Sequence, residues 1–202
     1  MPLDIENPGM DEDALKAALR TLVGGWVPLA SGIISSPQMF IDLDLPIEYI
    51  AFKLTCVGIL SDSNNYPAYA FSDDGGATYI YDTDMYDSYK YYSEYHIGGG
   101  AVVDCEENLN GSGPLTSIWV ETGDRYSVDM QIDPGETGKY PRVSSHLWIT
   151  NSNLSFSRIQ SMPSLATGRM NAIRLGSSGA FDVPPDSTNM ISGAYTLLGM
   201  LA

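Results

Sequence analysis

Apolar and polar residues alternate with a period of two through most of this 202-residue chain. The run 125–132 is the clearest case, because every even position is apolar and every odd position is polar. This period is typical of a β-strand with one buried face, and clusters of Gly, Ser, Asn, Asp and Pro between such runs indicate turns. Further strands are predicted at Trp26–Ala30, Met39–Leu43, Glu48–Leu60, Tyr66–Phe71, Thr78–Tyr81, Lys90–Ile97, Ala101–Cys105, Thr116–Glu121, Val143–Thr150, Ile173–Leu175 and Ile191–Leu197.

Many short strands separated by turns predict a mostly β protein, an antiparallel β-sandwich or jelly roll. In the last strand, Ile191, Gly193, Tyr195 and Leu197 are expected on one face, with the intervening small and polar residues on the other. We assign residues 26–202 to this β-domain.

The first 25 residues follow a different pattern. Leu15, Ala18, Leu19 and Leu22 recur at helical spacing, so a short amphipathic α-helix is predicted after an extended arm. A helix of this length is marginal alone in water, and its apolar face must therefore pack on something. The alternatives are its own β-domain, a partner protein, or copies of itself. We assign residues 1–25 to an attachment or oligomerisation segment.

The longest predicted strand directs Ile50, Phe52, Leu54 and Cys56 toward one face. Cys105 ends another apolar run, and both cysteines are predicted to be small core residues. A disulfide between them stays an alternative, which the lack of a secretory signal at the N-terminus disfavours.

The end of the chain resembles the fibre and spike β-domains of bacteriophage virions. These domains often finish with a pair of strands of the type IRL…SSG…SGxYxLLGL. The matching residues here are Ile173-Arg174-Leu175, Ser177-Ser178-Gly179 and the segment 192–199. The resemblance implies a virion structural protein that forms a homo-oligomer, often a trimer.

The net charge of −15 argues against a nucleic-acid partner, because a phosphate backbone requires a basic surface. It also argues against binding to an anionic membrane, and no apolar run is long enough to cross one. The charge indicates solubility, or avoidance of the anionic bacterial surface outside a specific site. The N-terminus lacks the basic and apolar regions of a signal peptide, so the protein is expected to assemble in the cytoplasm.

Ser72, Asp74, Gly76, Thr78 and Tyr79 match the Asp-box pattern S-x-D-x-G-x-T-W/Y. In this pattern the carboxylate and the hydroxyls bond to turn amides, glycine takes a positive φ, and the aromatic ring packs beneath the hairpin. The box recurs in sialidase propellers, where it is structural, but here it occurs once. It therefore predicts a β-hairpin and not sialidase activity.

The segment 79–95 holds seven of the 13 tyrosines, interleaved with acidic residues. Tyrosine offers a flat apolar face and a hydroxyl, which suits recognition of glycans or proteins. We take Tyr86, Tyr89, Tyr91 and Tyr92 as candidate ligand-binding residues. The alternative is that these tyrosines line a sheet face or a contact between subunits.

No metal or cofactor is expected. Asp82, Asp84 and Asp87 lack the spacing and the glycine of a calcium loop. His96 and His146 are the only histidines, and no third ligand accompanies them, which disfavours zinc. No nucleophile motif, phosphate-binding loop or distinguishable carboxylate pair occurs either. The chain is therefore expected not to be an enzyme.

Together these observations predict a phage head or tail fibre, spike or decoration protein whose β-domain projects outward. Its expected partners are other virion proteins, copies of itself, and a host surface polysaccharide. The first alternative is a lectin-like carbohydrate-binding module without a virion role, and the second is a glycan depolymerase.

Overall fold

The computed structural model describes residues 25–64, 66–80, 86–96, 100–109, 113–114, 120–137, 139–150, 155–163, 168–177 and 189–201. In these ranges the chain is mostly β, as the alternation predicts, and no helix occurs. None of the described residues forms a helix that could span a membrane. The helix predicted within residues 1–25, with Leu15, Ala18, Leu19 and Leu22, lies outside the described residues.

The described residues form strands that pair in two antiparallel sheets. Strands of the larger sheet follow the order β1-β12-β3-β8-β9-β10-β5-β6, and those of the smaller sheet the order β2-β11-β4-β7. In chain order the strands are β1 (Trp26–Ile34), β2 (Ile41–Asp44), β3 (Tyr49–Ser61), β4 (Pro67–Ser72), β5 (Tyr86–His96), β6 (Gly100–Leu109), β7 (Gly113–Pro114), β8 (Arg125–Asp133), β9 (Arg142–Thr150), β10 (Ser155–Pro163), β11 (Ala172–Ser177) and β12 (Met190–Leu201).

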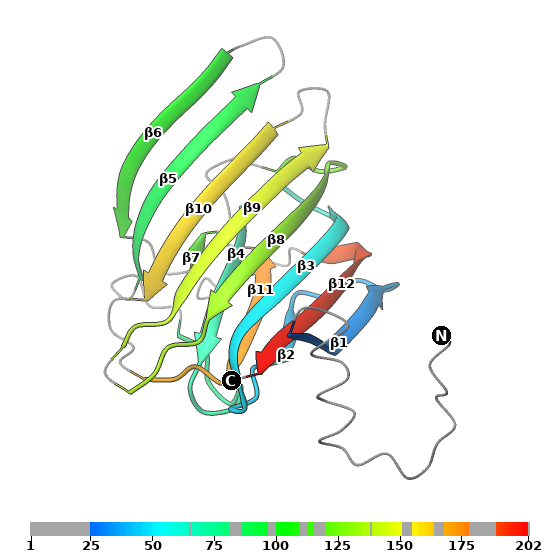
Figure 1. Cartoon of the computed structure of the whole chain (residues 1–202). Helices are drawn as coiled ribbons and strands as arrows, with labels where there is room; N and C mark the ends of the chain where they lie inside the picture. The colour runs from blue at the N-terminus through cyan, green and yellow to red at the C-terminus, as the bar shows by residue number, and fades with distance from the viewer. Residues whose placement is uncertain are drawn as a thin grey trace, which may run out of the picture.

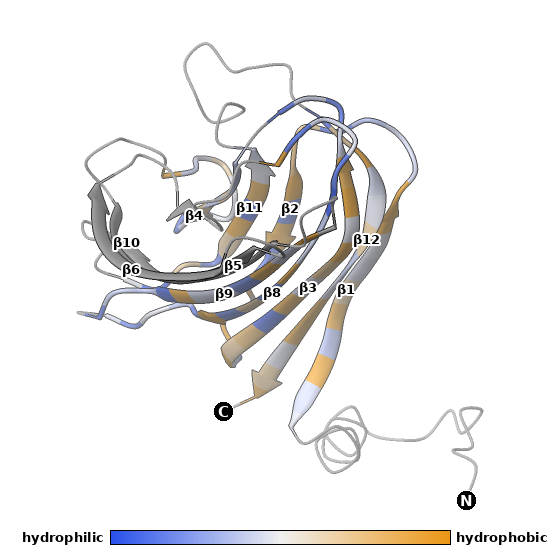
Figure 2. Cartoon of the chain, turned by 90° about the horizontal axis from the view of Figure 1, so that it is seen from above, coloured by the Kyte–Doolittle hydropathy of each residue, from blue (hydrophilic) through white to orange (hydrophobic). Residues whose placement is uncertain are grey.

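The smaller sheet lies against one face of the larger sheet (Figure 1). Seen from above, β9, β8, β3, β12 and β1 curve around β11 and β2 (Figure 2). The larger sheet therefore has an inner face, which meets the smaller sheet, and an outer face, which is turned away from it.

The core lies between the two sheets. Phe52 and Leu54 of β3 and Met130 of β8 belong to one buried cluster with Phe71 of β4 and Ile173 of β11. Period-two alternation explains this arrangement, because β3, β8 and β9 turn their alternate apolar residues toward the smaller sheet. The same alternation leaves polar residues of β3, β8 and β9 on the outer face.

One residue of the long strand departs from the predicted alternation. Phe52, Leu54 and Cys56 are buried as expected, but Ile50 is 48% exposed. The register between β12 and β3 shifts at this point, since Met200 pairs with Ala51 and the next residue of β12 pairs with Tyr49. Ile50 is the extra residue of this irregularity, so the prediction that it shares the inner face is wrong.

Candidate functional site

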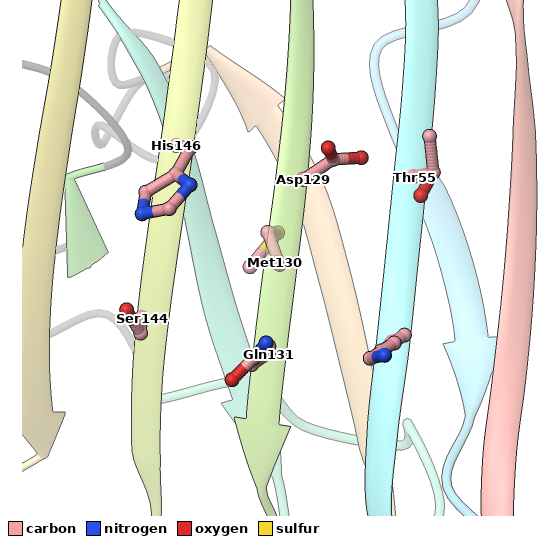
Figure 3. Close-up of a pocket in the computed structure, with 7 residues that line it drawn as sticks. Thr55, Asp129, Met130, Gln131, Ser144 and His146 are labelled. Atoms are coloured by element: carbon pink, nitrogen blue, oxygen red, sulfur yellow. The ribbon is translucent and has the colours of Figure 1, made fainter. Parts of the chain in front are cut away.

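A depression of about 300 Å³ lies on the outer face of the larger sheet. Three neighbouring strands supply its polar side chains, which Figure 3 shows close together on the same side of the sheet. The lining residues are Lys53 and Thr55 of β3, Asp129, Met130 and Gln131 of β8, and Ser144 and His146 of β9. Met130 lies between Asp129 and Gln131 in the strand, and its side chain belongs to the buried core.

Strand register arranges these side chains in two rows. Lys53 pairs with Gln131, which pairs with Ser144 on its other side. In the next row, Thr55 pairs with Asp129, and Asp129 pairs with His146. Directly opposed residues of paired strands have side chains on the same face, about 5 Å apart. The hydrogen-bonded backbone therefore holds six polar side chains in a fixed grid.

Indole rings border this grid on two sides. The Lys53 ammonium nitrogen lies 4.4 Å from the ring centroid of Trp26, which belongs to β1. The rings of His146 and Trp148 meet edge to face, with centroids 6.3 Å apart and planes at 88°. Both tryptophan residues are half-buried.

The chemistry of the depression is that of polar recognition. Lys53 donates hydrogen bonds, Asp129 accepts them, and the amide, hydroxyl and imidazole groups do both. Thr55, Asp129 and Gln131 are exposed, and Lys53, Ser144 and His146 are half-buried. Within the described part of the chain, no three His, Cys, Asp or Glu side chains are grouped to hold a metal ion.

The Asp-box residues form a hydrogen-bonded turn between β4 and Ile80, whose amide donates to the Phe71 carbonyl at 2.8 Å. The Ser72 hydroxyl donates to Asp74 at 2.7 Å and accepts from the Gly76 amide at 2.9 Å. Asp74 also accepts from the Thr78 amide at 2.9 Å and from the Thr78 hydroxyl at 2.5 Å. These bonds occupy the carboxylate within the turn, which is a structural role.

Two further contacts hold this turn against the smaller sheet. Asn171 accepts a hydrogen bond from the Gly75 amide at 2.8 Å and donates one to the Asp73 carbonyl at 2.7 Å. Gly75 and Gly76 have φ angles of 76° and 83°, a region that favours glycine. The ring centroid of Tyr79 lies 4.0 Å from the guanidinium carbon of Arg174 on β11.

The tyrosine candidates are placed by their backbone. Tyr86, Tyr89, Tyr91 and Tyr92 belong to β5, and β10 separates this strand from β9. Their side chains, and the residues Asp82 and Asp84, lie outside what the structure describes. The backbone thus places these tyrosines in the same sheet as the depression, two strands away from His146.

Cys56 is a buried, free thiol, as its predicted core position requires. Burial raises its pKa to about 12, and the nearby charge of Asp129 adds to the increase. A thiol with such a pKa stays protonated and is a poor nucleophile. Its partner in the disulfide alternative, Cys105, belongs to β6, and its side chain is outside the described part.

Sequence reasoning placed His146 beside Trp148 but missed the other members of the depression. Lys53, Thr55, Gln131 and Ser144 each occupy an outward position of an alternating run. The missing information was that their three strands are neighbours. A sequence pattern indicates which face a residue takes, but it does not indicate strand order when a long segment intervenes between two strands.

Comparisons with known proteins do not assign a family. No family model matches the chain. No curated protein matches it significantly. Among solved structures, an aerolysin-like protein of Bombina maxima aligns with 76% of this chain and 94% of its own, at 8% identity and a TM-score of 0.13. A similarity at this level carries no argument about fold or function.

Proposed function

We propose that this protein is a non-enzymatic structural component of a bacteriophage virion: a head or tail fibre, spike or decoration protein. The observation that carries the proposal is the position of the segments that resemble phage fibre and spike domains. Ile173–Leu175 lie in β11, an interior strand of the smaller sheet, and 192–199 lie in β12, between β1 and β3. The resemblance thus falls on one strand of each sheet, which supports a likeness of the whole domain.

We infer that the two sheets form a β-sandwich of the jelly-roll type. The antiparallel pairing and the shared core of Phe52, Met130, Phe71 and Ile173 support this fold. Such a domain is a rigid body that can project from a particle, with residues 1–25 as the attachment segment. Assembly would then take place in the host cytoplasm.

The edge of the larger sheet supports assembly of several copies. β1 ends this sheet, and neither β1 nor β12 contains a charged residue. Ile33 is 81% exposed and Val57 is 56% exposed, and both pair in register with Ala194. An exposed, uncharged edge strand favours association. In a chain of net charge −15, an uncharged edge also brings no like charges of its own strands together when two copies meet.

A lectin-like module without a virion role is the second candidate, and the polar depression with its two bordering indoles favours it. This function requires a protein that is stable as a monomer and does not need residues 1–25. A depolymerase, the remaining alternative, would release reducing ends from bacterial polysaccharide, and we expect none.

The experiment that tests the virion role is to purify phage particles from a lysate of the source bacterium and probe them with an antibody against the purified protein. We expect the protein to sediment with the particles at a fixed copy number. A version lacking residues 1–25 should keep the β-domain folded and fail to enter particles. Full incorporation of the truncated protein would contradict the role of this segment, and absence of the full-length protein from particles would contradict the virion role.

A further inference from the structure

We propose that the depression formed by Lys53, Thr55, Asp129, Gln131, Ser144 and His146 binds a neutral hexopyranose unit of a surface polysaccharide. This inference rests on the host-surface binding included in the proposed function, and it names the site and the class of ligand. It moves the expected contact from the tyrosines of β5 to the middle of the larger sheet.

The hydrogen-bonding groups fit a sugar. A hexopyranose presents adjacent hydroxyls, each of which donates and accepts, so a complementary site needs closely spaced donors and acceptors. The two rows offer this mixture within one backbone-fixed grid. The strands fix the backbone positions of these residues, so a ligand has to order only the side-chain rotamers and not the backbone.

The aromatic borders fit the other property of a sugar, its apolar C–H faces. Trp26 lies at the Lys53 side of the grid, and Trp148 lies at the His146 side. Tryptophan combines a large apolar surface with a polar N–H group, a combination that suits binding at a wet interface. Neither indole lines the depression itself, so each would contact a neighbouring unit of the polysaccharide rather than the pyranose in the depression.

Charge selects a neutral sugar over an acidic one. Asp129 is exposed at the centre of the grid, and the whole chain carries a net charge of −15. The one lysine of the site holds its ammonium over the Trp26 ring. A uronic or sialic acid would therefore meet repulsion from Asp129 and from the overall field.

The size of the depression indicates one sugar residue of a longer chain. About 300 Å³ is the lower end of the range for small-molecule sites. One shallow contact of this kind binds weakly, and several copies on one particle would supply the affinity through avidity.

The test uses the full-length protein and its two histidines as NMR reporters, with His146 assigned through a His146→Gln variant. The probes are glucose, galactose, mannose, N-acetylglucosamine, glucuronic acid and N-acetylneuraminic acid. We expect a saturable shift of the His146 ring signals with at least one neutral sugar, and weaker or no response to the two acids. Gln131→Ala removes a hydrogen-bonding amide, and Asp129→Asn replaces a charged acceptor with a neutral one, so each should raise the dissociation constant by about tenfold. Asp44→Asn, a matched change on β2, should leave it unchanged.

Three results would overturn the site. The first is an absence of His146 shifts with all six probes. The second is an unchanged affinity in Gln131→Ala and Asp129→Asn proteins whose NMR spectra show them folded. The third is binding that Tyr89→Ala and Tyr91→Ala abolish while the depression variants bind normally, which would keep surface binding but place it on β5. None of these results bears on the presence of the protein in virions, which the particle experiment measures independently.

Discussion

Arg174 and Asp42 form a two-point ion pair across β11 and β2. The Arg174 Nε donates to Asp42 Oδ1 at 2.6 Å, and its Nη2 donates to Oδ2 at 2.7 Å. The two residues are direct register partners. The guanidinium carbon also lies 4.4 Å from the ring centroid of Phe40 and 4.0 Å from that of Tyr79. Arg174 thus links the smaller sheet to the Asp-box turn.

This geometry predicts that Arg174→Lys destabilises the protein. Lysine keeps the charge but cannot form the planar two-point contact while also lying over the rings of Phe40 and Tyr79 with a flat guanidinium group. Because the Arg174 side chain is only 20% exposed, we expect a loss of about 1–2 kcal/mol in the free energy of unfolding. Urea unfolding followed by circular dichroism measures this change. Lys139→Arg, in the exposed pair with Glu136, is the control and should change stability by less than about 0.5 kcal/mol. Equal stability of Arg174→Lys and the wild type would show that the two-point geometry contributes nothing.

The Asp74 carboxylate makes the turn sensitive to acid. The Thr78 hydroxyl, the Thr78 amide and the Ser72 hydroxyl all bond to it, and they lower its pKa from 3.8 to about 2. A carboxyl whose pKa is lower in the folded than in the unfolded protein stabilises the folded state at pH values above its unfolded-state pKa. This stabilisation disappears as the pH falls through the folded-state pKa. We therefore expect the turn to lose this contribution between about pH 4 and pH 2.

The amide signal of Thr78 reports this titration by NMR. It should shift with a midpoint near pH 2, and Asp74→Asn should remove the shift because asparagine does not titrate. A midpoint near 3.8 in the wild type would mean that the hydrogen bonds do not favour the carboxylate. The exposed Asp73 is the matched control, and Asp73→Asn should leave the Thr78 profile unchanged.

The C-terminal motif contains a glycine whose position the packing explains. A Cβ atom at Gly199 would lie 2.5 Å from Cδ1 of Tyr49 and 2.7 Å from Cδ1 of Leu29, closer than real contacts allow. Gly199→Ala should therefore force one of these side chains to move and destabilise the fold by about 1–3 kcal/mol. Thermal unfolding measures the effect. The control is Gly75→Ala, where no atom lies within 4 Å and only the positive φ is unfavourable. A Gly199→Ala protein as stable as the wild type would indicate that Tyr49 has room to shift.

The sequence alone predicted those strands whose buried face follows from their own alternation of apolar and polar residues. Alternation in 125–132 and 143–150 predicted the buried faces of β8 and β9, and Val128 and Leu147 are buried there. It failed at Ile50, where an irregular pairing between β12 and β3 shifts the phase, because a shift of register depends on the partner strand. It also missed β10, since the segment 155–163 alternates too weakly to predict a strand. The depression was beyond sequence reasoning for a related reason, because it requires knowing that β3, β8 and β9 are adjacent.

The uncharged edge of the larger sheet leads to the last prediction. Ile33 is 81% exposed on β1, and Val57 and Ala194 extend the same apolar row across β12 to β3. If copies of the chain meet here, Ile33→Lys removes apolar contact from the interface and places two charges close together. We expect light scattering to give an oligomer for the wild type and a smaller mass for Ile33→Lys. Ile47→Lys changes a residue that is equally exposed but lies between β2 and β3. It is the control and should keep the wild-type mass.

A protein that starts at Gly25 separates the two assembly elements, which are the sheet edge and residues 1–24. An oligomer that survives this truncation but not Ile33→Lys places the contact at the sheet edge. An oligomer that is lost on truncation but resists Ile33→Lys contradicts the edge contact and assigns assembly to the preceding segment.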